Sequence, residues 1–349
     1  MLLFKLLFKL MIGWSFSSAF NLDAITASTH AKIEKKFRDN LSTKTPLFIK
    51  LKEKDGLETV NGGKELTYPV ILGRGNAGSY YGDDKFNISR PEGLQPLTFQ
   101  WKQFYSTIRI DGIEEIMNAG EGEGAKVFEG RMEQAEITTS EDFETMLFAD
   151  GTGNVGGDGT ARDWNGLQNI VADDPTTGTI GGLSRATYSK IRNQAYTTAV
   201  TGFNTAQAGR NALTTLWANC TQGQRSPNFI TTTVAIWVLY QLSLTTNERY
   251  VMEGSDKKLT SAGFPNIAFM NSPVTMSSAC SASHLYMLRI ARPKSTGGMF
   301  LIISNQRNFK MEPFIKPIDA DYRVAKVLSA GNLGCDAPYL QGVATNITG

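Results

Sequence analysis

The sequence predicts an α+β fold, on the strength of three patterns that differ in their periodicity. Apolar and polar residues alternate at 66–70 and 97–101, which is the period of a β-strand. Between 125 and 150 apolar residues recur at spacings of three and four, as they do on a helix. From 164 onward, strand-like and helix-like runs alternate, which is typical of a mixed sheet. The 349 residues suffice for one elongated domain or two compact ones.

The composition is that of an ordinary folded protein with little net charge. Hydrophobic residues make up 41% of the chain, and 35 basic residues against 33 acidic ones leave a net charge of +2. Proteins that coat nucleic acid carry a conspicuous basic excess, so we do not expect sequence-specific DNA binding. Cys220, Cys280 and Cys335 are widely spaced and odd in number. They predict neither a disulfide framework nor a zinc site, and they favour a reducing compartment.

The apolar start of the chain, residues 1–14, superficially resembles a secretory signal. Lys5 and Lys9 interrupt the apolar run, and no basic region precedes it. The run is also shorter than the roughly 20 apolar residues that span a membrane. We therefore expect no membrane partner. An arm that packs on another protein, or an atypical translated leader, is favoured over secretion.

A basic N-terminal region precedes a mildly acidic body. Residues 1–54 hold ten basic and four acidic residues, a net charge of +6. Residues 1–56 are therefore predicted to be an N-terminal arm that reaches a neighbouring subunit or nucleic acid. Its candidate contact residues are Lys32, Lys35, Lys36 and Arg38. A solvated helix face is an equally good interpretation of these four.

The strands predicted at 66–70 and 97–101 would form a long two-stranded excursion, an extended β-hairpin. Pro69 lies within the first strand, so that strand must lie at a sheet edge. The glycine-rich connection is too long for a tight turn and has few apolar anchors, so we expect a neighbouring subunit to order it. The candidate interface residues of this hairpin are Gly73, Arg74, Asn76, Tyr80, Tyr81, Asp83 and Asp84.

The next elements are a strand and a long helix. Ile108 and Ile110 continue a strand that Asp111-Gly112 ends. The helix predicted near 125–150 would be nearly 40 Å long at about 1.5 Å per residue, with Asp150-Gly151 as its C-terminal cap. Beyond it, helices are predicted at 205–219 and 234–247, and strands at 229–233, 267–270, 285–290, 299–304, 308–314 and 322–328.

Three groups of residues superficially resemble a metal site or a catalytic site, but none of them predicts one. The loop 150–158 lacks the ligand spacing of an EF-hand. Ser278 and His284 lack the GxSxG elbow and a third partner. Glu121 and Glu123 flank glycines as exposed turn charges commonly do. The sequence therefore predicts no enzyme, and neither a cofactor nor a metal.

Several short sequence segments, taken in their order along the chain, resemble those of one known family. They are GGKELTYPV at 62–70, SYYGDD at 79–84, LFADGTG at 147–153, DWNGL at 163–167, GGLSRATY at 181–188, and GNLGC at 331–335 with Pro338. Over roughly residues 35–345 the chain resembles the major capsid proteins of tailed bacteriophages, which have the Hong Kong 97-type fold. Some relatives crosslink lysine to asparagine, but no such pair is assigned here.

The resemblance implies a domain plan and a set of partners. It implies an extended loop at 57–104, a β-hairpin. It also implies a peripheral domain at 105–163 plus 299–349, in which the helix is the spine helix, and an axial domain at 164–298. It implies self-association into the hexamers and pentamers of an icosahedral virion shell. This shell would be assembled in the host cytoplasm around double-stranded DNA, with a separate scaffolding protein and a portal.

Two other functions remain open at this stage. An encapsulin-type nanocompartment has the same fold and encloses cargo proteins in place of a genome. A secreted β-rich hydrolase or adhesin belongs to a different class, and it requires the N-terminus to be a cleaved signal.

Overall fold

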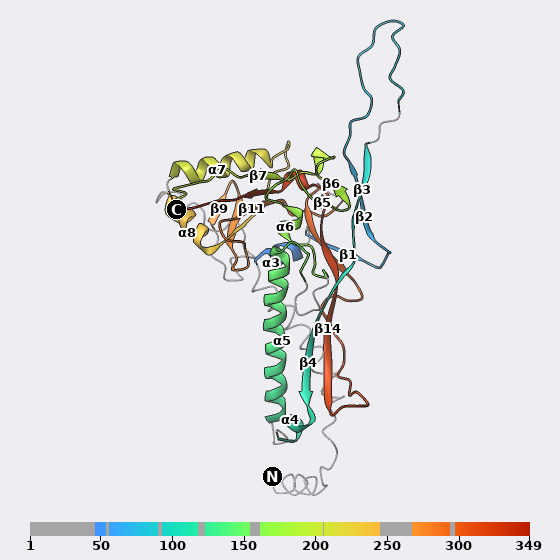
Figure 1. The fold of residues 1–349 in the computed structure, drawn as a ribbon, viewed down its shortest axis with the longest axis vertical. Coiled ribbons are helices and arrows are strands. Elements are labelled where there is room, and N and C mark those ends of the chain that lie inside the picture. The colour runs from blue at the N-terminus through green and yellow to red at the C-terminus, as the bar shows by residue number, and fades with distance from the viewer. Residues whose placement is uncertain are drawn as a thin grey trace, which may run out of the picture.

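The computed structural model describes residues 46–53, 56–89, 93–117, 123–153, 161–204, 206–244, 267–293 and 297–349. The molecule is elongated (Figure 1). A long hairpin projects at one end, and a narrow strip of one helix and two long strands forms the other. A broader body, which carries the C-terminus, lies beside the junction of these two parts.

The narrow strip is organised around one long strand, β14 (Tyr322–Cys335). Its first part pairs antiparallel with β4 (Lys102–Asp111), from Tyr322↔Asp111 to Gly331↔Lys102. Its last part pairs with β12 (Met299–Ser304). The short strands β1 (Leu57–Val60) and β13 (Lys310–Met311) complete this five-stranded sheet.

The long helix α5 (Glu123–Phe148) packs against β4. It begins two residues before the predicted 125 and ends two before 150, so the prediction of a long helix here is confirmed with small errors at its ends. The bond from Ala149 N–H to the Met146 carbonyl, at 3.2 Å, closes its last turn. Gly166 lies directly against this end of the helix, because a Cβ there would meet the backbone oxygens of Met146 and Ala149.

An aromatic cluster centred on Phe143 joins α5 to four other parts of the fold. The Phe143 ring makes edge-to-face contacts with Phe48, Trp164 and Phe309 at centroid distances of 5.2–5.3 Å. Phe104 of β4 is 6.4 Å away. These rings belong to one continuous core that also covers the base of the hairpin.

The broader body contains a six-stranded sheet in the order β7-β15-β11-β8-β10-β9. Its strands are β7 (Gln194–Tyr196), β15 (Gly342–Ala344), β11 (Leu285–Leu288), β8 (Phe229–Thr232), β10 (Ser272–Met276) and β9 (Ile267–Phe269). Alternate residues face opposite sides, as the period of two requires. Ile230 and Met287 face a core with helices α7 (Ala206–Asn219) and α8 (Val234–Ser243), whereas Phe229 and Tyr286 face the α5 core.

The remaining elements are short. The helices are α3 (Pro46–Lys52), α4 (Gly112–Met117) and α6 (Leu167–Ile170), and the 3₁₀ turns are η1 (Ser189–Ile191) and η2 (Pro338–Leu340). The strands β5 (Thr179–Ile180) and β6 (Leu183–Ser184) form a separate pair.

The structure differs from the predicted boundaries of elements and segments at four points. The arm does not extend to 56, because α3 buries Leu47 and Leu51 in the core. The hairpin does not begin at 57, because β1 pairs with β12 in the main sheet. The segment 299–349 is divided, because β15 joins the six-stranded sheet. The strand predicted at 308–314 shrinks to β13, because the buried Phe309 has a φ of 48° that interrupts extended backbone.

Candidate subunit interface

The base of the hairpin is held firmly in the core. Strands β2 (Leu66–Ile71) and β3 (Leu94–Phe99) pair antiparallel from Leu66↔Phe99 to Ile71↔Leu94. Pro69 lies opposite Pro96, and each strand of this two-stranded sheet has an outer edge, so the edge prediction for Pro69 is confirmed. Leu97 and Phe99 are buried. This ladder thus anchors whatever projects beyond it.

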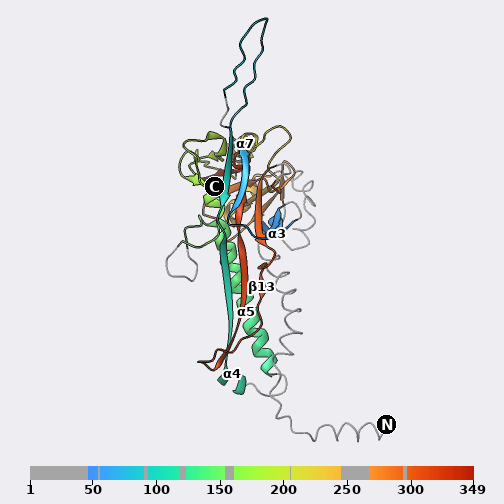
Figure 2. The same ribbon diagram turned by 90° about the vertical axis from the view of Figure 1, so that its right-hand side faces the viewer.

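Beyond Ile71 the two limbs of the hairpin leave the ladder and run outward to a turn (Figure 2). Tyr81 N–H donates to the Asp84 carboxylate at 2.9 Å, which closes the turn. The Asn76 side chain donates to the Asn87 carbonyl at 3.1 Å and so ties the limbs together. The rings of Tyr80 and Phe86 meet edge to face at 5.0 Å. These contacts shape the tip, although none of them reaches the body of the subunit.

The structure brings most of the candidate interface residues together on this projection. Gly73, Arg74, Asn76, Tyr80, Tyr81, Asp83 and Asp84 are all exposed residues of the hairpin tip. The candidates Lys32, Lys35, Lys36 and Arg38 lie outside the described residues, as does the predicted arm up to residue 45. The hairpin is therefore the part of the candidate interface that the structure places.

The hairpin tip exposes several apolar side chains within a polar stretch. Tyr81 and Ile88 are 90% and 92% exposed, and Phe86 is also largely exposed. Between 72 and 89, Arg74 and Lys85 balance Asp83 and Asp84, so the tip has no net charge. Exposed apolar groups on a neutral projection are typical of a protein contact, and they give DNA phosphates little to bind.

A second exposed apolar group lies at the opposite end of the molecule. Ile113 and Ile116 of α4, and Ile315 and Ile318 before β14, are exposed there. A bond of 2.9 Å from Gly112 N–H to the Asp321 carbonyl holds these two segments together. We did not predict this group from the sequence. In the sequence, these isoleucines are isolated residues in polar, turn-forming stretches, and nothing else there indicates an exposed apolar group.

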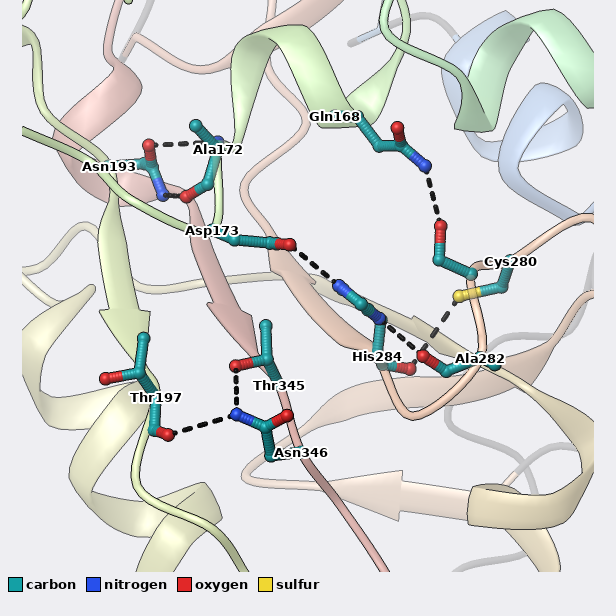
Figure 3. Close-up of polar contacts among 11 residues, drawn as sticks. Gln168, Ala172, Asp173, Asn193, Thr197, Cys280, Ala282, His284, Thr345 and Asn346 are labelled. Carbon is teal, nitrogen blue, oxygen red and sulfur yellow. Dashed lines mark hydrogen bonds and ion pairs between the residues drawn. The ribbon is translucent and has the colours of Figure 1, made fainter. Parts of the chain in front are cut away.

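The His284 region could be mistaken for a catalytic arrangement (Figure 3). Nε2 of His284 is 3.0 Å from an Asp173 carboxylate oxygen, and Nδ1 is 2.6 Å from the Ala282 carbonyl. Both ring nitrogens therefore face acceptors and not a nucleophile. The Cys280 thiol contacts the backbone carbonyl of His284 at 3.7 Å. Burial raises the pKa of the Cys280 thiol to about 12. A thiol in this state is not an activated nucleophile.

This polar cluster instead ties loops together at one end of the six-stranded sheet. Gln168 donates to Ser281 at 2.7 Å, and Asn193 donates to the Ala172 carbonyl at the same distance. Asn346 donates to the Thr197 carbonyl at 3.3 Å. In the described parts of the chain, no three His, Cys, Asp or Glu residues are placed to hold a metal ion. Within those same parts, no helix is both long and apolar enough to cross a membrane.

Glu144 of α5 links the helix to the six-stranded sheet. Its carboxylate accepts a hydrogen bond from Ser277, which follows β10 and is buried. Burial raises the pKa of Glu144 and nearby Glu141 adds to this effect, while the Ser277 bond opposes it. The folded protein therefore favours the protonated carboxyl. Its stability should fall as the pH rises from the ordinary glutamate pKa to the raised one, and this contribution should stay constant at higher pH.

Replacing Glu144 with glutamine should stabilise the protein at neutral pH by about 1 kcal/mol, a typical size for such a change. The amide oxygen can still accept from Ser277 without burying a charge. The gain should vanish well below the ordinary glutamate pKa, where Glu144 is protonated in both the folded and the unfolded state. Denaturant unfolding of both proteins at several pH values measures this. Glu133→Gln at an exposed site of α5 is the control, and an equal gain at all pH values would contradict the explanation.

Similarity to known proteins is found in the structure and not in the sequence. No family model matches the chain, and no curated protein sequence matches it. The capsid asymmetric unit of cyanophage A-1(L) is similar with a TM-score of 0.60 at 15% identity, covering 88% of this chain and 94% of that one. The capsid of the native GTA particle gives 0.54 at 10% identity, covering 86% and 90%. The capsid of Myoviridae phage XM1 gives 0.53 at 10% identity, covering 84% and 90%.

These similarities extend over nearly the whole length of each protein. The chain therefore has the Hong Kong 97-type capsid fold, a mixed helix-and-sheet fold of shell-forming proteins. The resemblance and the fold class predicted from the sequence are confirmed.

Proposed function

We propose that this chain is the major capsid protein of a tailed bacteriophage. It assembles as hexamers and pentamers into the icosahedral shell of the virion, in the host cytoplasm. The observation that carries this proposal is the hairpin. On a capsid fold, a projection with a buried base exposes Tyr81, Phe86 and Ile88 far from the rest of its own subunit. A neighbouring subunit can cover these residues, as repeated shell contacts require.

The charge of the chain suits a container for double-stranded DNA. A net charge of +2 gives little attraction to phosphate, and the DNA would be enclosed without sequence-specific binding. The proposal includes a separate scaffolding protein and a portal. The subunit itself contributes no catalysis and needs no cofactor. The geometry around His284 supports this role, because its ring nitrogens serve contacts within the fold.

The parts of the fold can be given roles under this proposal. The region before α3 is the arm, and the strip of α5, β4 and β14 is the core of the peripheral domain. The six-stranded sheet with α7 and α8 is the axial domain. It includes β15, although residues 342–344 lie beyond the predicted boundary of that domain.

The contents of particles from the producing cells test the proposal. Particles that contain this chain should protect double-stranded DNA of uniform length from added nuclease. Particles that hold a cargo protein and no DNA would overturn the phage function and identify a nanocompartment. Recovery of the chain only as a secreted monomer would overturn both.

A further inference from the structure

The link between the five-stranded sheet and the hairpin contains an asparagine followed by glycine, Asn61-Gly62. Strand β1 ends at Val60 and β2 begins at Leu66, so residues 61–65 carry the chain from the sheet to the hairpin. Figure 1 shows β1 and β2 at the foot of that projection. All five residues of the link are exposed and lie outside any helix or strand. A chemical change in this link therefore acts at the root of the hairpin.

The backbone of the link leaves the reactive atoms of this pair unobstructed. The backbone nitrogen that follows an asparagine can attack the side-chain amide carbon, and glycine hinders the attack least because it has no Cβ. Gly62 has a φ of 112°, and nothing lies within 4 Å of the position where a Cβ would be. Among the described residues, none accepts a hydrogen bond from the Gly62 N–H. The Gly62 nitrogen is thus free to approach the Asn61 side chain.

A neighbouring side chain activates the Asn61 amide. Asn305 follows β12, and its backbone N–H donates to the Val60 carbonyl at 3.3 Å, which holds it beside the end of β1. The side-chain N–H of Asn305 donates to the side-chain carbonyl oxygen of Asn61. A donor at this oxygen makes the amide carbon more electrophilic and stabilises the negative charge that the oxygen acquires during attack.

A second pair of the same type, Asn165-Gly166, lies in the opposite environment. Gly166 is buried, and a Cβ there would meet the backbone oxygens of Met146 and Ala149. The Asn165 N–H donates to the Asn332 side chain at 2.9 Å. Attack at this pair would require the peptide group to rotate within a packed site. The fold should therefore protect Asn165 and leave Asn61 reactive.

We propose that Asn61 is a site of spontaneous covalent modification, at which the folded chain converts asparagine to aspartate and isoaspartate. The Gly62 nitrogen loses its proton to solvent and forms a bond to Cγ of Asn61. The bond from Cγ to Nδ2 then breaks, and ammonia leaves. Water opens the resulting cyclic imide, at the side-chain carbonyl to give aspartate or at the main-chain carbonyl to give isoaspartate. The net reaction consumes one water and releases one ammonia.

The modification changes both the charge and the geometry of the link. The net charge of the chain falls from +2 to +1, because 35 basic residues then face 34 acidic ones. The new carboxylate lies between Glu58 and Glu65 in the sequence. In isoaspartate the main chain runs through the side chain, which lengthens the link by one carbon atom. The reaction needs no assembled particle, so this inference is independent of the proposed shell function.

Peptide mapping by mass spectrometry tests the proposal on the full-length protein, held at physiological temperature and near-neutral pH. Trypsin cleaves after Lys54 and Lys64 and so releases residues 55–64. This peptide should acquire the mass of the aspartate form, as two separable isomers, at least about tenfold faster than the peptide that contains Asn165. In denaturant the two asparagines should convert at similar rates, because both are then exposed. Isoelectric focusing of the intact chain measures the loss of charge independently.

Two variants serve as controls. Asn61→Gln should abolish the charge change, because its longer side chain closes a ring much less readily. Asn305→Ala, at an exposed position, should slow conversion of Asn61 several-fold, and an unchanged or faster rate would overturn the role assigned to Asn305. Equal rates at Asn61 and Asn165 in the folded protein would overturn the proposal. So would an Asn61 that converts in denaturant but stays intact in the folded protein.

Discussion

Replacing Phe143 with alanine is expected to lower the free energy of unfolding by about 3–5 kcal/mol, the usual cost of removing a buried phenyl ring. Phe143 is only 1% exposed, and its ring contacts four aromatic side chains. These come from α3, β4, the segment that follows α5, and the turn before β13. The cavity left by alanine would therefore loosen the contacts of α5 with all four segments at once.

Denaturant unfolding of the unassembled subunit measures the effect of Phe143→Ala. Glu141→Ala, at an exposed position two residues earlier on the same helix, is the control and should change stability by less than about 0.5 kcal/mol. A loss below about 1 kcal/mol for Phe143→Ala would contradict a well-packed core at this junction.

Shortening the hairpin should separate folding from assembly. We expect that replacing residues 74–89 with Asn-Gly, which forms tight hairpin turns, leaves thermal unfolding of the subunit nearly unchanged. The removed residues are exposed, while Leu97 and Phe99 keep the base buried. Particle yield should fall by at least about tenfold, because a loss of about 1.4 kcal/mol already weakens each contact between subunits tenfold.

Analytical sedimentation and thermal unfolding together measure the effect of this truncation. Unchanged particle yield would show that the tip makes no essential contact between subunits. A large loss of subunit stability would show that the tip packs on its own subunit. Tyr81→Ser with Ile88→Ser keeps the hairpin length and tests whether the apolar side chains carry the contact.

The elements with a clear period were predictable from the sequence. The hairpin strands alternate strictly, and the run from 125 to 150 keeps its helical spacing in spite of Thr138 and Thr139. The candidate residues of the hairpin tip followed from its length and its glycine content. Phe86 and Ile88 were missed because single apolar residues in a polar stretch carry no periodic signal.

The full length of β14 was not predictable from the pattern. The predicted strand stopped at 328, whereas β14 continues to Cys335 through two glycines, which normally weaken a strand. Gly331 is required there because a Cβ atom would meet the carbonyl oxygen of Ile302 and the ring of Trp164. Only the packing of distant segments shows this requirement.

The short strands β1, β7 and β15 escaped prediction for a related reason. Each has three or four residues, too few for a periodic pattern. Each is fixed by a partner far away in the sequence, as β1 is by β12.

Electron cryomicroscopy of the assembled product tests the central claim most directly. The chain, expressed with a scaffolding protein if one is required, should form closed icosahedral particles. Their density should fit this fold, with the hairpin of each subunit lying on a neighbour. A product that stays a monodisperse monomer at high concentration under every assembly condition would contradict the shell function.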